Sequence, residues 1–279
     1  MHYRAVWTIL RDTFVAWNEH EAPRLGAALA FYTILSLAPL VILVIAIAAL
    51  IFGHSAAQGQ LLAQVDGLIG RQGSEAVRGM IEHAQKPASG AFASIAGVIT
   101  LLFGASGVFG ELRSALNLIW DVKPAGGAGL WGTLRERFFS LGMVLAVGFL
   151  LLVSLVVSAA LATLGKFFGG VLLMPEFVLN GINILVSLAG TSVLFALIFR
   201  YVPETRMPWN RIRAGAIATA LLFTIGKSLI GLYLGKAAVG SAYGAAGSLV
   251  VVIVWVYYSA MIFLFGAEFT HVLGSSSNE

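Results

Sequence analysis

The residue whose type and position most strongly suggest chemistry is Lys227, because it lies within a long apolar block. An ionisable side chain inside a membrane span is costly to bury and is by default a candidate functional group. At about 1.5 Å per helical residue, Lys227 lies roughly 10 Å from the outer end of its block at Leu234. Two interpretations remain open. The ammonium faces a functional cavity, or its flexible stem carries it to the interface or into a structural hydrogen bond.

Further polar side chains recur every three to four residues in another apolar block and therefore form one helical face. They are Asn180, Asn183, Ser187 and Thr191. Such a stripe lines a hydrated cavity or bonds to a neighbouring helix, and both interpretations remain open.

In the first block, Ser36 and Pro39 interrupt the apolar pattern, and Pro39 cannot donate to the carbonyl of Leu35. A kink is therefore predicted at Pro39.

The sequence contains no arrangement of residues typical of catalysis or cofactor binding. The five histidines lie in connectors and termini without metal-ligand spacing. The serines lack a neighbouring His–Asp pair, and no phosphate-binding or dinucleotide motif occurs. The chain has no cysteine, which excludes disulfides and thiolate sites. Glu268 ends the last apolar block, on the same helical face as Tyr257, and is expected to be a solvated carboxylate. We therefore predict no catalytic residue, no metal site and no cofactor.

Six long apolar blocks must position these residues, and they decide the fold class. Charged residues make up only 11% of the chain, whereas 59% is apolar, which a soluble protein of 279 residues cannot bury. Each block approaches the roughly 20 residues that a spanning helix needs, and their continuous apolar character excludes a membrane β-barrel. We predict an all-α, polytopic membrane protein with six spans, at about 27–52, 92–109, 138–164, 177–199, 214–234 and 245–267.

The distribution of Lys and Arg predicts the orientation of this bundle. Eleven of the 17 basic side chains fall in the N-terminal segment and in the connectors after the second and fourth spans, and five fall on the opposite side. The positive-inside rule then places both termini in the cytoplasm. The net charge of +4 reflects this bias, and no basic run suggests a nucleic-acid surface, so no nucleic-acid partner is expected.

The segments outside the spans divide the chain into three parts. Residues 1–26 are predicted to form a cytoplasmic, interfacial amphipathic helix, with Val6, Leu10, Phe14 and Trp17 on one face. Residues 27–270 form a single membrane domain, and 271–279 form a short cytoplasmic tail. The outer connector, 54–91, is predicted to form two short amphipathic helices separated at Gly70 and Gly73. This connector is either a lid or a structural cap.

Several stretches of the sequence carry a family resemblance. They are Ala28–Pro39 (ALAFYTILSLAP), Gly104–Phe109 (GASGVF) followed by Ala115–Trp120 (ALNLIW), Tyr243–Leu249 (YGAAGSL), Trp255–Ala260 (WVYYSA) and Gly266–Thr270 (GAEFT). In this order, over nearly the whole chain, the sequence resembles the YihY/BrkB family of bacterial inner-membrane proteins. The resemblance implies a multi-pass protein of the inner membrane.

The resemblance implies little about activity. Members carry an older ribonuclease label and a virulence label, without a settled molecular activity. The ribonuclease interpretation is disfavoured because the sequence has no His/Asp metal cluster. Some relatives are linked to the export of lipid A precursors, so the resemblance favours a transporter or flippase-like protein for a lipid or another amphipathic anion. The alternatives are a non-transporting envelope scaffold and, less favoured, a membrane enzyme.

Transport predicts a groove between helices, lined by Lys227 and some of four further residues. These residues are Tyr32, Ser36, Asn183 and Tyr257.

Gly104, Ser106 and Gly107 are expected to allow close helix packing. The expected partners are membrane lipids and a lipid or amphipathic substrate. A homo-oligomer is one possible use of the glycine-rich spans.

Overall fold

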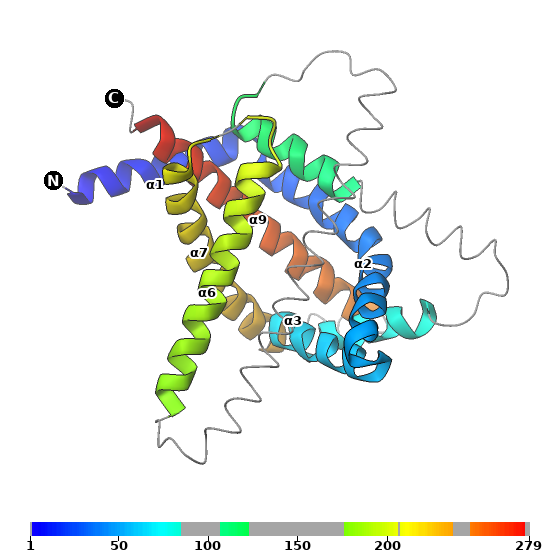
Figure 1. Ribbon diagram of the computed structural model, residues 1–279. Helices are drawn as coiled ribbons and strands as arrows, with labels where there is room; N and C mark the ends of the chain where they lie inside the picture. Colours follow the sequence, from blue (N-terminus) through cyan, green and yellow to red (C-terminus); the bar gives the residue numbers. More distant parts are fainter. Residues whose placement is uncertain (1, 85–106, 123–175, 206, 237–245, 277–279) are drawn as a thin grey trace.

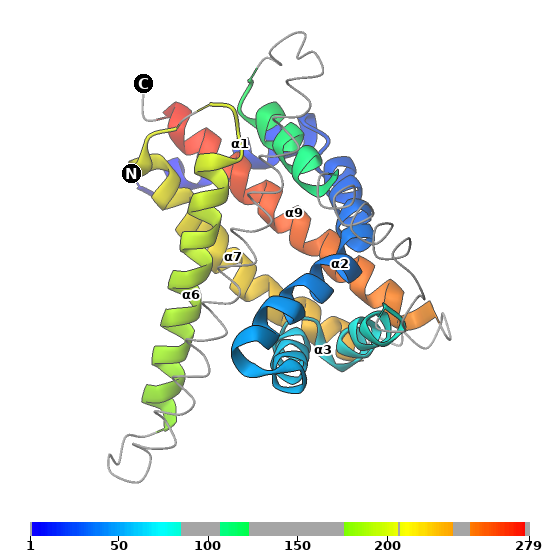
Figure 2. The ribbon, with the colours of Figure 1, turned by 45° about the vertical axis from the view of Figure 1, so that its right-hand side comes forward.

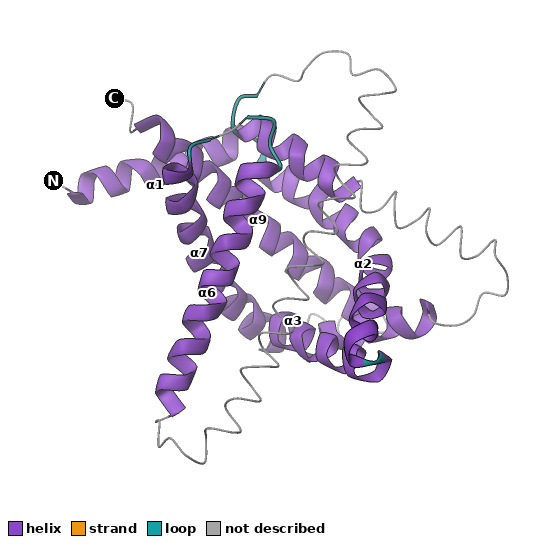
Figure 3. Cartoon of the chain, viewed as in Figure 1, coloured by secondary structure: helices purple, strands orange, loops and turns teal. Residues whose placement is uncertain are grey.

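The computed structural model describes residues 2–84, 107–122, 176–205, 207–236 and 246–276 (Figure 1). Within these ranges all of the long regular elements are α-helices (Figure 3). They are α1 (His2–Glu19), α2 (Ala22–Phe52), α3 (His54–Ala84), α6 (Glu176–Tyr201), α7 (Trp209–Lys236) and α9 (Gly247–Ser276). A further helical segment covers residues 107–119. The described structure thus agrees with the predicted all-α class.

Three of these helices are long and apolar enough to cross a membrane. The stretches are Ile184–Tyr201 in α6, Trp209–Tyr233 in α7 and Gly247–Ser275 in α9. They overlap the predicted spans 177–199, 214–234 and 245–267.

The other three predicted spans are described less completely. The first, 27–52, lies within α2, which contains the apolar stretch Ala22–Leu37 among the residues whose side chains are described. Residues 92–106 and the whole span 138–164 lie outside the described residues, and so do Gly104 and Ser106.

The described helices pack around α9. This helix contacts α7, α2, α1 and α3, and α6 packs against the side of α7. Figures 1 and 2 both show α1 at one end of the molecule, beside the C-terminal end of α9, and α3 at the other end. The two termini of the chain therefore lie at the same end, as the predicted topology requires. The side of the membrane on which they lie remains a prediction.

Local backbone chemistry explains where α2 and α3 begin and end. Pro23 lies in the first turn of α2, where its missing N–H leaves no intrahelical bond unmade. Gly53 ends α2 with a φ of 78° that favours glycine. Within α3, Gly70 has a φ of 75° and a ψ of 175° and breaks the helix into two. The break coincides with the first of the two glycines that were predicted to separate two short helices.

Small side chains bring α7 and α9 together in an antiparallel crossing. A Cβ atom at Gly215 would overlap with Thr270, and a Cβ atom at Gly266 would overlap with Thr219. Each helix thus offers a glycine to the threonine of the other. Both threonines are fully buried, and each hydroxyl donates to the carbonyl four residues earlier at 2.7 Å. Small residues of this kind allow close backbone approach between membrane helices.

An aromatic cluster packs next to this crossing. Phe199 and Phe263 have ring centroids 5.3 Å apart, and Phe195 lies 5.9 Å from Phe263. Trp120 approaches Phe199 edge-on at 6.0 Å and connects the 107–119 segment to α6. These side chains are almost completely buried. They position the last turn of α6 and the C-terminal half of α9.

Candidate functional site

A buried acidic side chain is the most unusual feature of the described structure. Glu268, on α9, has no exposed side-chain surface, and its Oε1 atom lies 2.7 Å from Nδ1 of His20. His20 itself is 23% exposed. The two residues are 248 positions apart in the chain. Their contact joins the corner between α1 and α2 to the C-terminal part of α9.

The surrounding elements explain why the pair forms. His20 follows the last residue of α1, and Glu21 adopts a φ of 50°, so the chain turns sharply into α2. Ala22, at the start of α2, is fully buried and fixes this corner to the bundle. Glu268 lies between Gly266 and Thr270, two of the residues with which α9 packs closely against α7. The close crossing therefore sets the position of the carboxyl group.

One oxygen of Glu268 has no hydrogen-bond partner among the described residues. Oε2 is completely buried, whereas Oε1 bonds with His20. A buried carboxylate oxygen without a donor is energetically costly. Glu19 and Asp121 act electrostatically on Glu268. Asp121 and His20 act in the same way on His271, which lies one turn further along α9. Among the described residues, the site is therefore a buried carboxyl with one hydrogen-bond donor, His20, beside further titratable side chains.

This burial corrects the expectation that Glu268 is a solvated carboxylate. The expectation was wrong because α1 and the α1–α2 corner fold against α9 and cover the end of the last span. A signal was present in the sequence. Glu268 lies four residues after Leu264, which is fully buried, so both lie on the same helical face. His20, treated as one of several scattered histidines, was missed as the partner.

Lys227 lies on the side of α7 that faces the bundle. The side chain is half-buried, and it shares a helical face with Ala220, Phe223 and Ile230. Ala220 is completely buried and Ile230 is 7% exposed. Within the described part of the chain, the lysine ammonium has no hydrogen bond or ion pair. The structure therefore contains a half-buried cation, without a described partner, inside a membrane-spanning helix.

The other predicted site residues lie at separate places in the bundle. The ring of Tyr32 packs against Gly107, where a Cβ atom would lie 2.6 Å from Cδ1 of the tyrosine. Tyr257 packs against Gly26, with Cε2 at 3.6 Å from the position of a Cβ atom. Ser36 is 5% exposed and donates to the carbonyl of Thr33 at 3.0 Å.

The positions of the remaining predicted residues are described only in part. Asn183 belongs to α6, but its side chain lies outside the described residues. The backbone of α2 is helical through Pro39, and the predicted kink remains a prediction. In the described part of the chain no hydrogen bond joins Lys227 to Tyr32, Ser36 or Tyr257. A site shared by all of these residues therefore remains a hypothesis.

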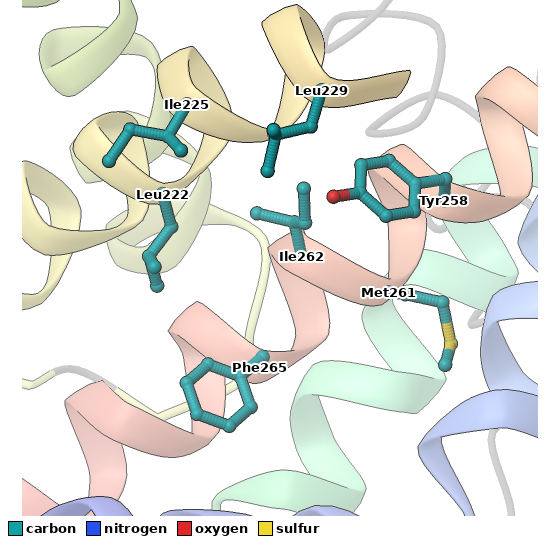
Figure 4. Close-up of a pocket in the computed structure, with 8 residues that line it drawn as sticks. Leu222, Ile225, Leu229, Tyr258, Met261, Ile262 and Phe265 are labelled. Carbon is teal, nitrogen blue, oxygen red and sulfur yellow. The ribbon is translucent and has the colours of Figure 1, made fainter. Parts of the chain in front are cut away.

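An apolar groove of about 270 Å³ runs between α7 and α9 (Figure 4). Its lining comprises Leu222, Ile225, Gly226 and Leu229 from α7, and Tyr258, Met261, Ile262 and Phe265 from α9. The Tyr258 hydroxyl supplies a polar group close to Gly226. None of the predicted site residues lines this groove. Leu222, Ile225 and Leu229 lie two to five positions from Lys227 and therefore on the opposite face of α7, and Gly226 directly precedes the lysine.

Polar contacts connect the segments at the end of the molecule that holds the termini. Arg113, in the 107–119 segment, donates to Glu204 in the α6–α7 turn at 2.8 Å. The backbone N–H of Glu204 donates to Asn117 at 3.0 Å. Arg200 donates to the carbonyl of Met207 and lies over the ring of Trp209. The segments predicted to be cytoplasmic thus meet at one end.

No group of three potential metal-ligating side chains occurs among the described residues.

Comparison with known proteins identifies the family. A family model with the description Virulence factor BrkB matches residues 13–279, which is nearly the whole chain. The chain belongs to the BrkB family. This confirms the resemblance that was inferred from the sequence stretches, among them Gly266–Thr270. In this BrkB protein, that stretch contains both the residues that pack α9 against α7 and the buried Glu268.

The relatives of this BrkB protein are named as membrane proteins. A UPF0761 membrane protein of Verminephrobacter eiseniae is 32% identical over 256 residues, which cover 90% of this chain and 58% of the relative. One of Teredinibacter turnerae is 27% identical over 281 residues, or 96% of this chain and 60% of the relative. One of Cronobacter sakazakii is 32% identical over 177 residues, or 61% and 59%.

The chain therefore spans somewhat more than half the length of these relatives. No solved structure gives a significant match. Together with the three spanning helices among the described residues, these relatives identify the chain as a membrane protein of the BrkB family.

Proposed function

We propose that this protein is a transporter or flippase-like protein of the bacterial inner membrane, which moves a lipid or another amphipathic anion. The observation that carries the proposal is Lys227, a half-buried ammonium inside the α7 span with no partner in the described residues. A cation in such a position is energetically costly and is by default a functional-site hypothesis.

The position of Lys227 suits an anionic headgroup. The lysine lies six residues before Tyr233, the end of the apolar stretch of α7, and therefore about 9 Å inside it. Its ammonium offers three donors to a phosphate or carboxylate without demanding one fixed geometry. A lipid headgroup would pass Lys227 on the bundle side of α7, while its acyl chains remain among apolar side chains.

The two faces of α7 have different proposed roles, one toward the headgroup of a lipid and the other toward a hydrocarbon chain. The groove between α7 and α9 is lined by apolar side chains and the Tyr258 hydroxyl, so its chemistry fits a hydrocarbon chain. Because it lies on the helix face opposite Lys227, we do not assign the headgroup path to it. This separation makes Lys227 the residue on which the proposal depends.

The test uses purified protein reconstituted in liposomes and follows the movement of fluorescent phospholipid between leaflets. Lys227→Gln keeps the approximate length of the side chain and removes its charge. Loss of a charge-assisted contact is expected to slow the movement about tenfold or more. Lys227→Arg keeps the charge and should retain most of the rate. Ser228→Ala, one residue further along α7 and exposed, is the matched control and should move lipid at the rate of the wild type.

Two other outcomes would contradict the proposal in different ways. Movement that is equal in wild type and Lys227→Gln would remove Lys227 from the path. No movement by any variant, with or without an ion gradient, would favour the scaffold alternative, which predicts envelope partners that co-purify with the protein.

A further inference from the structure

We propose that His20 and Glu268 form a proton-binding site that connects the α1–α2 corner to α9. The ligand is a single proton taken from water. The geometry of the pair supports this proposal, which does not depend on the identity of a transported substrate.

The distance of 2.7 Å between Nδ1 of His20 and Oε1 of Glu268 requires one proton between these two atoms. With a neutral imidazole and an ionised carboxylate, the buried pair has a net charge of −1. Oε2 is then a completely buried oxygen with no donor among the described residues. Such a charge is costly in a low-dielectric interior.

Uptake of one proton removes this charge. The proton comes from water at the exposed edge of His20 and ends either on Nε2 of the imidazole or on the carboxyl group of Glu268. In the first case the pair is an imidazolium and a carboxylate, and in the second it is a neutral imidazole and a carboxylic acid. Both products have no net charge, and the uptake breaks no covalent bond to carbon.

The charged and titratable groups around the pair come from α1, α7, α9 and the end of the 107–119 segment, as far as the structure describes the chain. Glu19 lies at the end of α1, Asp121 follows the 107–119 segment, and His271 is one turn further along α9. Arg211, at the start of α7, approaches the backbone of α9, since a Cβ atom at Gly274 would lie 3.2 Å from its Nη1. The carboxylate of Glu21 is engaged by Arg24 at 2.6 Å on the exposed side of the corner.

Protonation changes a contact between separate elements. The pair lies where the α1–α2 corner meets α9, and α9 contacts α2, α3 and α7 in the described structure. A charge change at this contact therefore alters the free energy of holding the corner against the central helix. A role for this proton in driving movement of a substrate rests on the proposed transport function. Proton binding itself does not.

The direct test is infrared difference spectroscopy of the full chain in lipid nanodiscs, titrated between about pH 5 and pH 8. The wild type is expected to show a pH-dependent carboxyl or carboxylate band that Glu268→Gln lacks. Glu75→Gln, which removes an exposed carboxyl on α3, is the matched control and should keep the band. Identical difference spectra of wild type and Glu268→Gln would overturn the proposal.

A second variant keeps the test independent of any folding defect in Glu268→Gln. His20→Asn retains an N–H donor near the position of Nδ1 but lacks the imidazole ring. The midpoint of the Glu268 band is expected to shift in this variant, whereas an unchanged midpoint would exclude His20 from the site.

A separate liposome experiment measures whether the proton site affects the rate of lipid movement. In liposomes that move lipid, a pH gradient should change the wild-type rate but not that of Glu268→Gln. If a gradient changes both rates equally, the proton site does not drive transport. If no lipid moves, the proposed function fails while the infrared result still decides the proton site.

Discussion

At the scale of single residues, the buried Glu268 has one hydrogen-bond donor in the described part of the chain, Nδ1 of His20. The carboxyl group has no exposed surface, and its second oxygen has no described partner. Removing the donor therefore leaves a buried polar group entirely unsatisfied, which costs more than the net contribution of an ordinary hydrogen bond.

His20→Ala is expected to lower the free energy of unfolding by about 1–3 kcal/mol. Reversible unfolding in mixed micelles, followed by tryptophan fluorescence, measures this change. The same substitution in a Glu268→Ala background should cost less, because the carboxyl is then absent. His54→Ala, at the exposed start of α3, is the control and should change stability by less than about 0.5 kcal/mol. Equal losses in both backgrounds would show that His20 and Glu268 are not coupled.

At the scale of elements, the crossing of α7 and α9 depends on two glycine–threonine contacts. Gly215 accommodates Thr270, and Gly266 accommodates Thr219. Separation of the two helices would therefore break both glycine–threonine contacts. The crossing also fixes the part of α9 that carries Glu268, which links packing to the candidate proton site.

Gly215→Ala is expected to destabilise the protein by about 1–3 kcal/mol, because the new methyl group overlaps with the buried Thr270. Gly231→Ala, on the same helix, is the matched control. No described atom lies within 4 Å of its added methyl group, so the substitution should be neutral or stabilising by about 0.5–1 kcal/mol. Thermal unfolding of both variants in detergent distinguishes them, and equal midpoints would contradict the proposed crossing.

The break in α3 makes a second prediction at this scale. Gly70 has a φ of 75° and a ψ of 175°, a conformation that essentially only glycine adopts. Gly70→Ala should therefore cost about 1–3 kcal/mol, whereas Gly67→Ala, at a helical position in open space, should not destabilise the protein. If limited proteolysis finds α3 equally protected in both variants, the break is not required.

At the scale of the whole molecule, the segments that were predicted to be cytoplasmic meet at one end. His20 contacts Glu268 there, Arg113 contacts Glu204, and α3 lies at the opposite end. The absence of cysteine from the chain makes the orientation of these two ends directly measurable.

Single cysteines introduced at Asn18 and Ser55, which are both exposed, should react from opposite sides of the membrane. With both termini in the cytoplasm, Ser55→Cys reacts with a membrane-impermeant maleimide in intact spheroplasts. Asn18→Cys reacts only after the membrane is disrupted. The reverse pattern would invert the predicted topology, and labelling of both cysteines from outside would contradict it.

Hydropathy and turn chemistry predict much of this architecture because they depend on neighbouring residues. The spans in α6, α7 and α9 and the break at Gly70 are of this kind. The pairing of His20 with Glu268 and the glycine–threonine crossing depend on how distant helices dock, which one sequence does not reveal. The position of Lys227 within a span was predicted from sequence because a charge in an apolar block is itself a local signal, and its role in a site stays a prediction.

The central claim, that an amphipathic anion passes Lys227, is tested most directly by its charge selectivity. In liposomes, the rates for an anionic and a zwitterionic fluorescent phospholipid with the same chains are compared for wild type and Lys227→Gln. We predict that the wild type moves the anionic lipid faster, and that the variant moves both at similar, slower rates. A preference for the anionic lipid that persists in Lys227→Gln, or a wild type without any preference, would contradict the account.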